Sequence, residues 1–337
     1  MQGEIEHISI EGIASAVPEN EVCNDDYVAK IENRRVKKQI LLTGIDRRRV
    51  TIGEQKASDL AVVAADRLLN HLKWKRSEID VIIFVTQSPD LVRPSTAFLI
   101  QDRLGISKDC MVYDINQGCA GYIVGLTTIC SILQVTRGKG LLLVGESNAI
   151  DGEEVDRNAL LEGDAAAATA LMYNENTTAM KFINHSDGSR ANYLYKTLNN
   201  YAFMDGNAVL LFGLSDVADS VIKFMGDNHL DVADIDYYVF HQAQKMIVDG
   251  IAQAVGIPED RCLNSCQLFG NTSSASVPLT ICLEKEKRKL TGKKKLLLCG
   301  YGIGLTWGII MLDMDMDVVF PIMESDYTFE DRKKFEI

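Results

Sequence analysis

Short apolar runs alternate with longer amphipathic stretches along most of this chain. Short runs rich in Val, Ile and Leu are typical of buried strands, whereas apolar positions that recur every three or four residues are typical of helices. The pattern predicts helices at residues 57–72, 96–104, 119–135, 210–225, 244–255 and 274–288, and strands at residues 81–86, 111–115, 140–144, 237–241, 295–299 and 308–313. Strands that are each followed by a helix predict βαβ units in mostly parallel sheets covered by helices.

The same layout of strands, helices and glycines occurs twice. Four pairs of anchors stand in the same order in both copies: Asp80 and Asp236, Gly105 and Gly256, Gly118 and Gly270, and Gly145 and Gly300. Their separation of about 150 residues is far longer than a solenoid unit, and it has the size of a domain. The repeat therefore predicts a duplicated domain.

The repeat divides the chain into three parts. We expect an N-terminal half at residues 1–175, a C-terminal half at residues 176–313 and an appendage outside the repeat at residues 314–337. Two α/β halves packed against each other predict five alternating layers of helices and sheets, in the order α-β-α-β-α.

Composition and charge exclude several classes of protein. The net charge is −12, which disfavours nucleic acid as a partner, and no apolar run has the roughly 20 residues of a membrane span. The N-terminal residues lack a signal-peptide pattern, so a cytoplasmic protein is the default expectation. The eight cysteines lack the spacing of a zinc site, and we expect neither a metal nor disulfides. Basic residues at 34–38 and 47–49 provide either a patch for an acidic partner or an ordinary solvated surface.

Candidate chemistry centres on Cys119, where a predicted strand gives way to a predicted helix. The second copy of the repeat places His241 at the end of a strand and Asn271 at the position equivalent to Cys119. A thiol, an imidazole and an amide are the parts of a covalent acyl-transfer site. The partial positive charge of a helix N-terminus favours a thiolate, so we expect a lowered pKa at Cys119. Each residue also has a purely structural interpretation: a buried cysteine, a strand-end histidine and an Asn in a turn.

Seven ordered motifs carry a resemblance to a known family. They lie at residues 42–45, 118–122, 163–164, 187–189, 241–243, 270–278 and 300–308. Together they identify the chain as similar to the ketoacyl-ACP synthase III enzymes of the thiolase-like superfamily, over nearly all residues up to about 312. The resemblance implies a thiolase fold and a homodimer without a cofactor. It also implies transfer of an acyl group from acyl-CoA or acyl-ACP, followed by decarboxylative condensation with malonyl-ACP. An acyl carrier protein is therefore an expected partner.

The resemblance also assigns roles to residues. It implies that Cys119 carries the acyl group and that His241 and Asn271 bind the malonyl thioester. A second oxyanion donor is implied at Ile303, within the loop formed with Gly302 and Gly304.

The chain departs from the family at several substrate positions. Lys38 and Leu42 stand where members have the Trp and Arg that sandwich the CoA adenine. Substrate contacts are implied at four further positions: Arg93, Glu162, Met204 and Gln244. Three of them depart from the residues usual in the family. Arg93 replaces a Phe that closes the acyl pocket across the dimer, Glu162 an apolar residue, and Gln244 an Asn. These changes predict a primer other than acetyl-CoA.

Two other functions remain open. One is an acyltransferase on the same fold that passes the acyl group of Cys119 to an alcohol or amine of a sugar or natural product. The other is a non-catalytic protein that binds acyl carriers, and the presence of Cys119, His241 and Asn271 disfavours it. Release of CO2 from malonyl-ACP separates the condensing enzyme from the acyltransferase.

Overall fold

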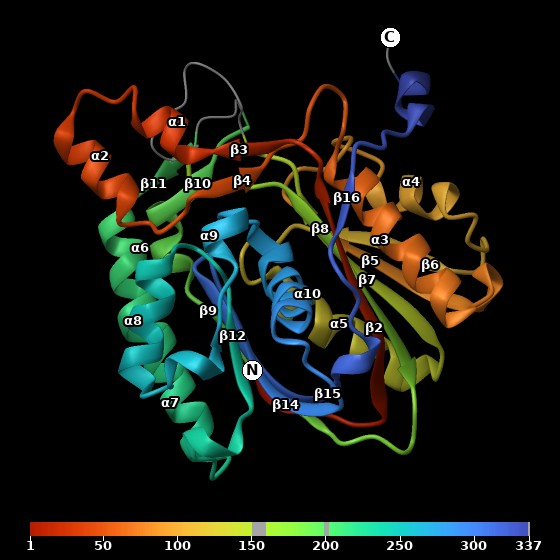
Figure 1. Cartoon of the computed structure of the whole chain (residues 1–337). Coiled ribbons are helices and arrows are strands. Elements are labelled where there is room, and N and C mark those ends of the chain that lie inside the picture. Colours follow the sequence, from red (N-terminus) through yellow and green to blue (C-terminus); the bar gives the residue numbers. More distant parts are fainter. Residues whose placement is uncertain (150–159, 199–201, 336–337) are drawn as a thin grey trace.

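Two six-stranded sheets and the helices around them form five stacked layers (Figure 1). The computed structural model describes residues 1–149, 160–198 and 202–335. Helices α5 and α10 lie between the sheets, and further helices cover each outer face. The predicted α-β-α-β-α arrangement is confirmed.

The first sheet is built mainly from the N-terminal half. Its strands lie in the order β16-β2-β8-β7-β5-β6. Their bounds are β2 Ile8–Pro18, β5 Ile79–Val85, β6 Met111–Ile115, β7 Lys139–Glu146, β8 Ala165–Tyr173 and β16 Met323–Ser325.

The second sheet repeats this order with the strands of the C-terminal half. Its order is β1-β9-β15-β14-β12-β13. The bounds are β1 Gln2–Ile5, β9 Met180–Ser186, β12 Tyr237–Phe240, β13 Cys262–Leu263, β14 Lys293–Gly302 and β15 Thr306–Asp315. The two matching orders confirm that the fold is duplicated.

The prediction of mostly parallel sheets is wrong. In each sheet the three strands around β5 or β12 are parallel, whereas β8 and β15 pair antiparallel with both of their neighbours. The sequence pattern missed β2, β8 and β9, because β8 begins with a run of alanines and β9 mixes polar and apolar residues. Antiparallel strands need no helical crossover between them, so the βαβ pattern does not reveal them.

The central layer consists of α5, Gly121–Thr136, and α10, Ser276–Arg288. Both helices bury apolar residues against both sheets, in one core that includes Leu126, Leu133 and Ile281. A helix enclosed by two sheets has to be apolar around most of its circumference. This layer brings the N-terminal ends of α5 and α10 into the interior, where the site lies.

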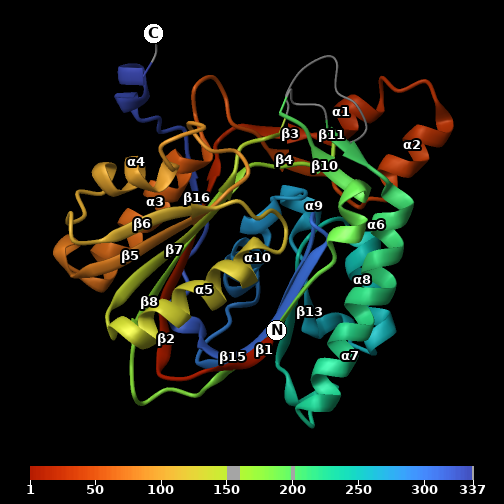
Figure 2. The same cartoon turned by 180° about the vertical axis from the view of Figure 1, so that it is seen from behind.

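The outer helices cover the far faces of the sheets (Figure 2). Helices α3, Ala57–Leu72, and α4, Thr96–Arg103, cover the first sheet, and α7, Ala218–Asp227, and α8, Lys245–Val255, cover the second. The shorter elements are α1 Asn24–Val28, α2 Arg34–Leu41, α6 Gly206–Phe212, α9 Cys266–Phe269, β3 Glu21–Cys23, β4 Arg47–Arg49, β10 Leu194–Lys196 and β11 Ala202–Met204. The helix predicted at 210–225 is part of a longer stretch, in which a π-helical turn at Gly213–Val217 joins α6 to α7.

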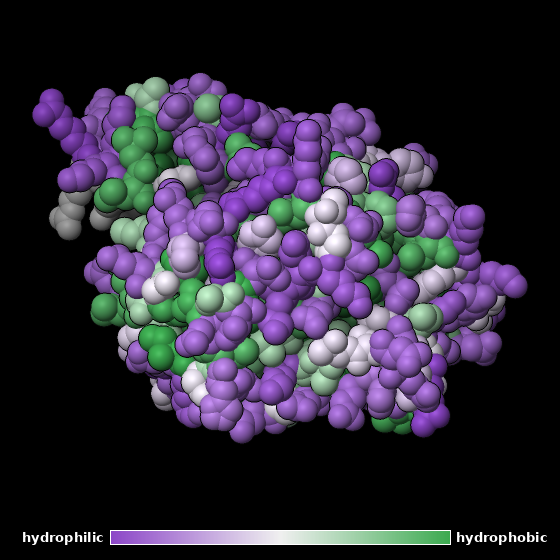
Figure 3. All heavy atoms as spheres, turned by 60° about the horizontal axis from the view of Figure 1, so that its bottom comes forward, coloured by the Kyte–Doolittle hydropathy of each residue, from purple (hydrophilic) through white to green (hydrophobic). Residues whose placement is uncertain are grey.

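The two halves exchange edge strands. Strand β1, at the start of the chain, pairs with β9 in the second sheet. Strand β16, near the end, pairs with β2 in the first sheet. Residues 314 and 315 complete β15, and the segment that follows packs against the N-terminal half through β16. Figure 3 shows one face of the molecule, on which hydrophilic side chains predominate and hydrophobic ones form small groups.

Candidate active site

Cys119 lies in the loop between β6 and α5, where the two halves meet. Strand β14 of the second half passes directly over it. A Cβ atom placed on Gly302 would lie 2.6 Å from Cys119 Cβ and 3.0 Å from its Sγ. Because any larger residue would displace the thiol, this close approach requires glycine.

His241 follows β12 and is almost completely buried, with 1% of its surface exposed. Its backbone N–H donates to the Cys299 carbonyl at 2.7 Å, which continues the pairing of β12 with β14. The ring Nδ1 lies 2.8 Å from Ser276 Oγ, and the Tyr301 ring packs edge-on at 5.3 Å. The ring is therefore held on two sides.

The protonation of the His241 ring follows from its surroundings. Ser276 Oγ accepts from Gln242 N–H at 3.4 Å, and we assign its hydroxyl hydrogen to the bond with Nδ1 of His241. This arrangement assigns the ring hydrogen to Nε2. Burial lowers the pKa of His241 to about 3, although the backbone of Ser273 acts in the opposite direction. The imidazole is neutral, and Nε2–H is its donor.

Asn271 ties the two halves together. Its N–H donates to the Leu161 carbonyl at 2.7 Å, and its own carbonyl accepts from Gly163 N–H at 3.1 Å. Its side-chain Oδ1 accepts from Ser273 N–H at 2.9 Å. With the oxygen bound in this way, the amide NH2 group is the part of the side chain that can donate to a ligand.

Ser273 joins the three candidate residues. Its hydroxyl lies 3.9 Å from Cys119 Sγ, its N–H binds Asn271, and its backbone affects the pKa of His241. Ser273 thus connects Cys119 of one half with His241 and Asn271 of the other. The sequence reasoning did not single out Ser273 or Ser276. The run of small hydroxyl residues directly after Asn271 was the available signal.

The predicted thiolate is wrong for the resting site. Burial raises the pKa of Cys119 to about 12, and the charges of Glu146 and Glu162 add to the effect, while Ser273 opposes it. Helix α5 begins at Gly121, two residues later than predicted for this strand–helix junction. Desolvation of a negative charge therefore outweighs the helix terminus, and Cys119 is a thiol at neutral pH.

The glycine-rich loop lies beside the loop that carries the nucleophile. Gly302 is buried at the end of β14, Ile303 is half-buried and Gly304 is exposed. Ile303 Cγ2 lies only 2.8 Å from where a Cβ atom of Gly118 would be. The loop therefore touches the residue directly before Cys119.

The four further substrate positions are spread more widely. Glu162 is exposed, and its backbone forms an isolated β-bridge with Asn271. Arg48 donates to the backbone carbonyl of Glu162 at 3.0 Å. Arg93 is exposed in the loop between β5 and α4, Met204 ends β11, and Gln244 directly precedes α8. Within the described residues, no hydrogen bond or ion pair joins these last three to Cys119, His241 or Asn271.

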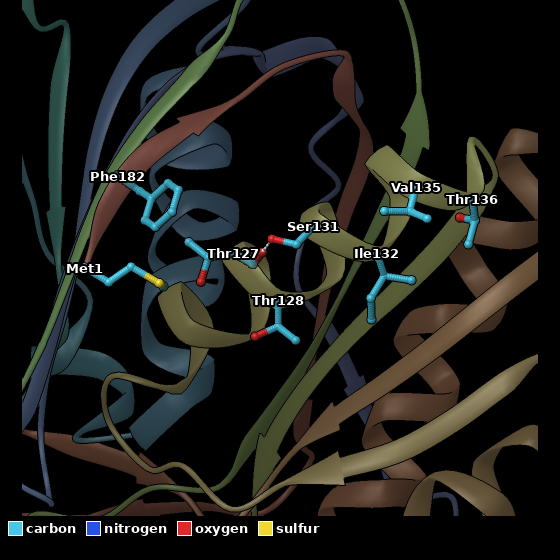
Figure 4. A pocket seen from close by; sticks show the side chains of 8 residues that line it. All are labelled: Met1, Thr127, Thr128, Ser131, Ile132, Val135, Thr136 and Phe182. Atoms are coloured by element: carbon cyan, nitrogen blue, oxygen red, sulfur yellow. Dashed lines mark hydrogen bonds between the residues drawn. The ribbon is translucent and has the colours of Figure 1, made fainter.

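Two hollows lie away from this point. One, of about 570 Å³, is lined by α5, Met1 and Phe182 (Figure 4). The other, of about 550 Å³, lies between α8, α9 and α10. Neither hollow is lined by Cys119, His241 or Asn271.

Two further properties concern the described part of the chain. Among residues 1–149, 160–198 and 202–335, no group of three or more His, Cys, Asp or Glu side chains could hold a metal ion. None of the described helices is both long and apolar enough to cross a bilayer. The cysteines are all free.

Comparison with known proteins assigns the family. The family model described as 3-Oxoacyl-[acyl-carrier-protein (ACP)] synthase III matches residues 113–188, and that of its C-terminal part matches residues 225–314. The matched segments include Cys119, His241 and Asn271.

Relatives agree over nearly the whole chain. A beta-ketoacyl-[acyl-carrier-protein] synthase III of Neisseria meningitidis is 33% identical over 91% of this chain and 99% of its own. One from Clostridium perfringens is 33% identical over 81% of this chain and 89% of its own. The crystal structure of a 3-oxoacyl-(acyl-carrier protein) synthase from Burkholderia xenovorans superposes with a TM-score of 0.90 at 30% identity, covering 96% and 99% of the two chains. The chain therefore belongs to the ketoacyl-ACP synthase III family of the thiolase-like superfamily, whose members are condensing acyltransferases.

Proposed function

We propose that the chain transfers an acyl group to Cys119 and condenses it with malonyl-ACP, releasing CO2. The observation that carries this proposal is the convergence of Cys119 from one half with His241 and Asn271 from the other, around Ser273. A thiol provides the covalent intermediate, and two neutral donors provide a site for a negatively charged oxygen.

The first half-reaction is acyl transfer. The sulfur of Cys119 attacks the thioester carbon of the primer, a new S–C bond forms, and the carrier thiol leaves with a proton. Because the pKa of Cys119 is about 12, the sulfur loses its proton as it attacks. The N–H groups of Cys119 and Ile303 would stabilise the oxyanion, and the position of Ile303 beside Gly118 supports this role.

The second half-reaction is decarboxylative condensation. The malonyl thioester carbonyl accepts from His241 Nε2–H and from the Asn271 amide. Loss of CO2 leaves an enolate, whose oxygen these donors stabilise, and the enolate carbon then attacks the acyl group and releases the Cys119 sulfur. The pKa of about 3 keeps the His241 ring neutral, so its Nε2–H provides an uncharged donor to the enolate oxygen.

A homodimer and an acyl carrier protein are the partners we propose. Strand β6 lies at the edge of the first sheet, with one row of backbone groups unpaired by a neighbouring strand. Large exposed apolar side chains lie on β6 and near it: Met111 is 48% exposed, Phe98 49% and Val92 97%. A second copy pairing at this edge would cover them and would carry its Arg93 toward the first copy. A cytoplasmic location remains our expectation for this enzyme.

The primer is proposed to be carried by a protein or to be an unusual CoA ester. Lys38 and Leu42 are both exposed and offer no aromatic face to adenine. Stacking of a base on an aromatic ring contributes about 1–3 kcal/mol, and 1.4 kcal/mol corresponds to a tenfold change in affinity. The comparison of Cys119 acylation rates with acetyl-CoA and with matched acyl-ACPs tests this. Faster acylation by acetyl-CoA would contradict it.

An acyltransferase of the same fold is the second candidate, and Glu162 favours it, because its backbone pairs with Asn271 and its charge acts on Cys119. A hydroxyl or ammonium acceptor would be bound better by a carboxylate than by the apolar residue usual in the family. The deciding experiment incubates the acylated enzyme with malonyl-ACP. Release of CO2 with a β-ketoacyl-ACP product supports condensation, whereas a stable acyl-enzyme that discharges only to alcohols or amines supports the second candidate.

A further inference from the structure

A buried carboxylate that the mechanism above does not use lies close to the nucleophile. Glu146 is the last residue of β7 and is only 3% exposed. Gln87 N–H and the Ser88 hydroxyl each donate to it at 2.8 Å, and the Asn148 amide donates at 3.2 Å. Strands β5 and β7 are parallel neighbours, so Glu146 holds the loop that follows β5.

Gln87 extends this link to the loop of the nucleophile. Its side-chain nitrogen donates to Asn116 Oδ1 at 3.0 Å. Its side-chain oxygen lies 2.5 Å from where a Cβ atom of Gly118 would be. Gln87 therefore packs against the residue that precedes Cys119, and Glu146 fixes the backbone of Gln87.

The internal repeat gives Glu146 a counterpart. The anchors Gly145 and Gly300 place Glu146 at the position equivalent to Tyr301. Tyr301 supports the other half of the site, since its hydroxyl donates to the His241 carbonyl at 3.1 Å and its ring packs against the imidazole. The position after the strand-end glycine thus supports the functional residue in the C-terminal half. In the N-terminal half the same position is occupied by a carboxylate.

The charge of Glu146 acts on Cys119. It raises the pKa of the thiol, as does Glu162. Burial in turn raises the pKa of Glu146 to about 8, with a further contribution from Glu162 and Asp164. Glu146 therefore changes its charge in the pH range in which the enzyme would work.

Other charged and titratable groups lie near this pair. Glu162 and Asp164 lie just before β8, Arg48 on β4 donates to the Glu162 carbonyl, Tyr301 on β14 faces Cys119, and the neutral His241 ends β12. Of these, Glu162 is exposed, so water screens its charge, whereas Glu146 is buried.

We propose that Glu146 is a positioning residue for the nucleophile: it anchors the Gln87–Ser88 loop against Gly118, and its carboxylate, when ionised, opposes a second negative charge on Cys119. This inference rests on the proposed role of Cys119. It assigns to the buried carboxylate both a structural and an electrostatic effect on acylation.

The charge is tested with Glu146→Gln, which keeps an acceptor for Gln87 N–H but removes the charge. The measurement is the rate of alkylation of Cys119 by iodoacetamide between pH 6 and 10, followed by peptide mass spectrometry. Exposed Cys23 is the internal reference. We expect alkylation of Cys119 at pH 8 to be about three- to tenfold faster than in the wild type, because the thiol ionises at lower pH. Superimposed pH profiles, or an equal shift with Glu162→Gln, would overturn the proposal.

The anchor is tested independently with Gln87→Ala, which leaves Glu146 in place. We expect acylation of Cys119 by an acyl thioester to fall about tenfold or more, while the rate of alkylation at pH 8 stays near that of the wild type. Acylation of Gln87→Ala at the wild-type rate would refute the link. Because alkylation needs only an accessible thiol, a normal alkylation profile in a wild-type enzyme that is never acylated would count against the proposed function alone.

Discussion

Ser276 Oγ lies 2.8 Å from His241 Nδ1 and joins the first turn of α10 to the end of β12. The contact fixes which ring nitrogen faces the substrate. It also shows how the central layer of the fold takes part in the site, because a helix buried between two sheets carries the hydroxyl that orients the imidazole.

Replacement of Ser276 should separate the two half-reactions. In Ser276→Ala the buried Nδ1 atom loses its partner, at a cost of about 1–3 kcal/mol, and the ring can adopt the other tautomer. We expect condensation to fall about tenfold to a hundredfold while acylation of Cys119 changes little. Single-turnover measurements of each step check this.

Ser274 provides a matched control for this variant. Its hydroxyl is buried within the same segment and has no hydrogen-bond partner among the described residues. Ser274→Ala should leave both steps near the wild-type rate. Equal losses of the condensation rate in the two variants would show that any change in this segment is harmful. The tautomer of His241 would then not explain the loss in Ser276→Ala.

The contact of Gly302 with Cys119 gives a second prediction. A methyl group at Gly302 would lie 2.6 Å from Cys119 Cβ, so Gly302→Ala has to displace the nucleophile. A displacement of about 1 Å commonly costs about a hundredfold in rate, and we expect acylation to fall by that amount. The control is Gly226→Ala on α7, where no atom lies within 4 Å of the added carbon. Unchanged acylation by Gly302→Ala would place the thiol elsewhere.

The duplicated halves and the candidate residues could be predicted because they depend on local signals. Alternating strands and helices, and glycines at equivalent places, identified the five layers and the positions of Cys119, His241 and Asn271. The edge strands could not be predicted, because β1 pairs with β9 and β16 with β2, across most of the chain. Such pairing depends on the assembled core and leaves no mark on a short segment.

The raised pKa of Cys119 could not be predicted from the sequence either. The position of Cys119 before a helix favoured a thiolate, but burial of the thiol acts more strongly, and the charge of Glu146 adds to its effect. Glu146 is far from Cys119 in the sequence and reaches it only because β5, β6 and β7 are neighbours. The role of Ser273 could not be predicted for a similar reason, because only the fold brings its hydroxyl close to Cys119 Sγ.

The neutral state of His241 predicts a pH dependence of stability. The pKa of His241 is about 3 in the folded protein, whereas an unfolded histidine has a pKa of about 6.5. Below pH 6.5 the unfolded chain takes up a proton that the buried ring does not, so this group makes the folded state lose about 1.4 kcal/mol per pH unit down to about pH 3.

Thermal denaturation at pH 7.5 and pH 5.0 measures this effect. His241→Gln should lose less stability between the two pH values than the wild type. The control His229→Asn replaces an exposed histidine and should follow the wild type. If wild type and His241→Gln respond alike to acid, the buried ring is not neutral in the folded enzyme.

The C-terminal segment should contribute to stability through Arg332. Its guanidinium binds Asp59 at 2.6 Å and Asp90 at 2.9 Å, and both carboxylates are fully buried. Arg103 binds the same two carboxylates and would remain in Arg332→Ala. Removing one partner of a buried ionic group costs about 3–5 kcal/mol, and we expect the lower value because Arg103 compensates in part.

The melting temperature of the whole enzyme reports this loss. Arg332→Ala should lower it by about 5 °C or more. Lys333→Ala removes an exposed pair with Glu330 and should change it little. An unchanged melting temperature in Arg332→Ala would mean that the segment from 323 onward is dispensable for the fold.

Both half-reactions depend on the acyl group carried by Cys119. The most direct measurement is the intact mass of the enzyme, with peptide mapping, after incubation with an acyl-ACP in the absence of malonyl-ACP. We predict the mass of one acyl group on the Cys119 peptide and no adduct in Cys119→Ala, in which seven cysteines remain. An acyl adduct that persists in Cys119→Ala, or a wild-type enzyme that condenses the primer without ever carrying it on Cys119, would contradict the account.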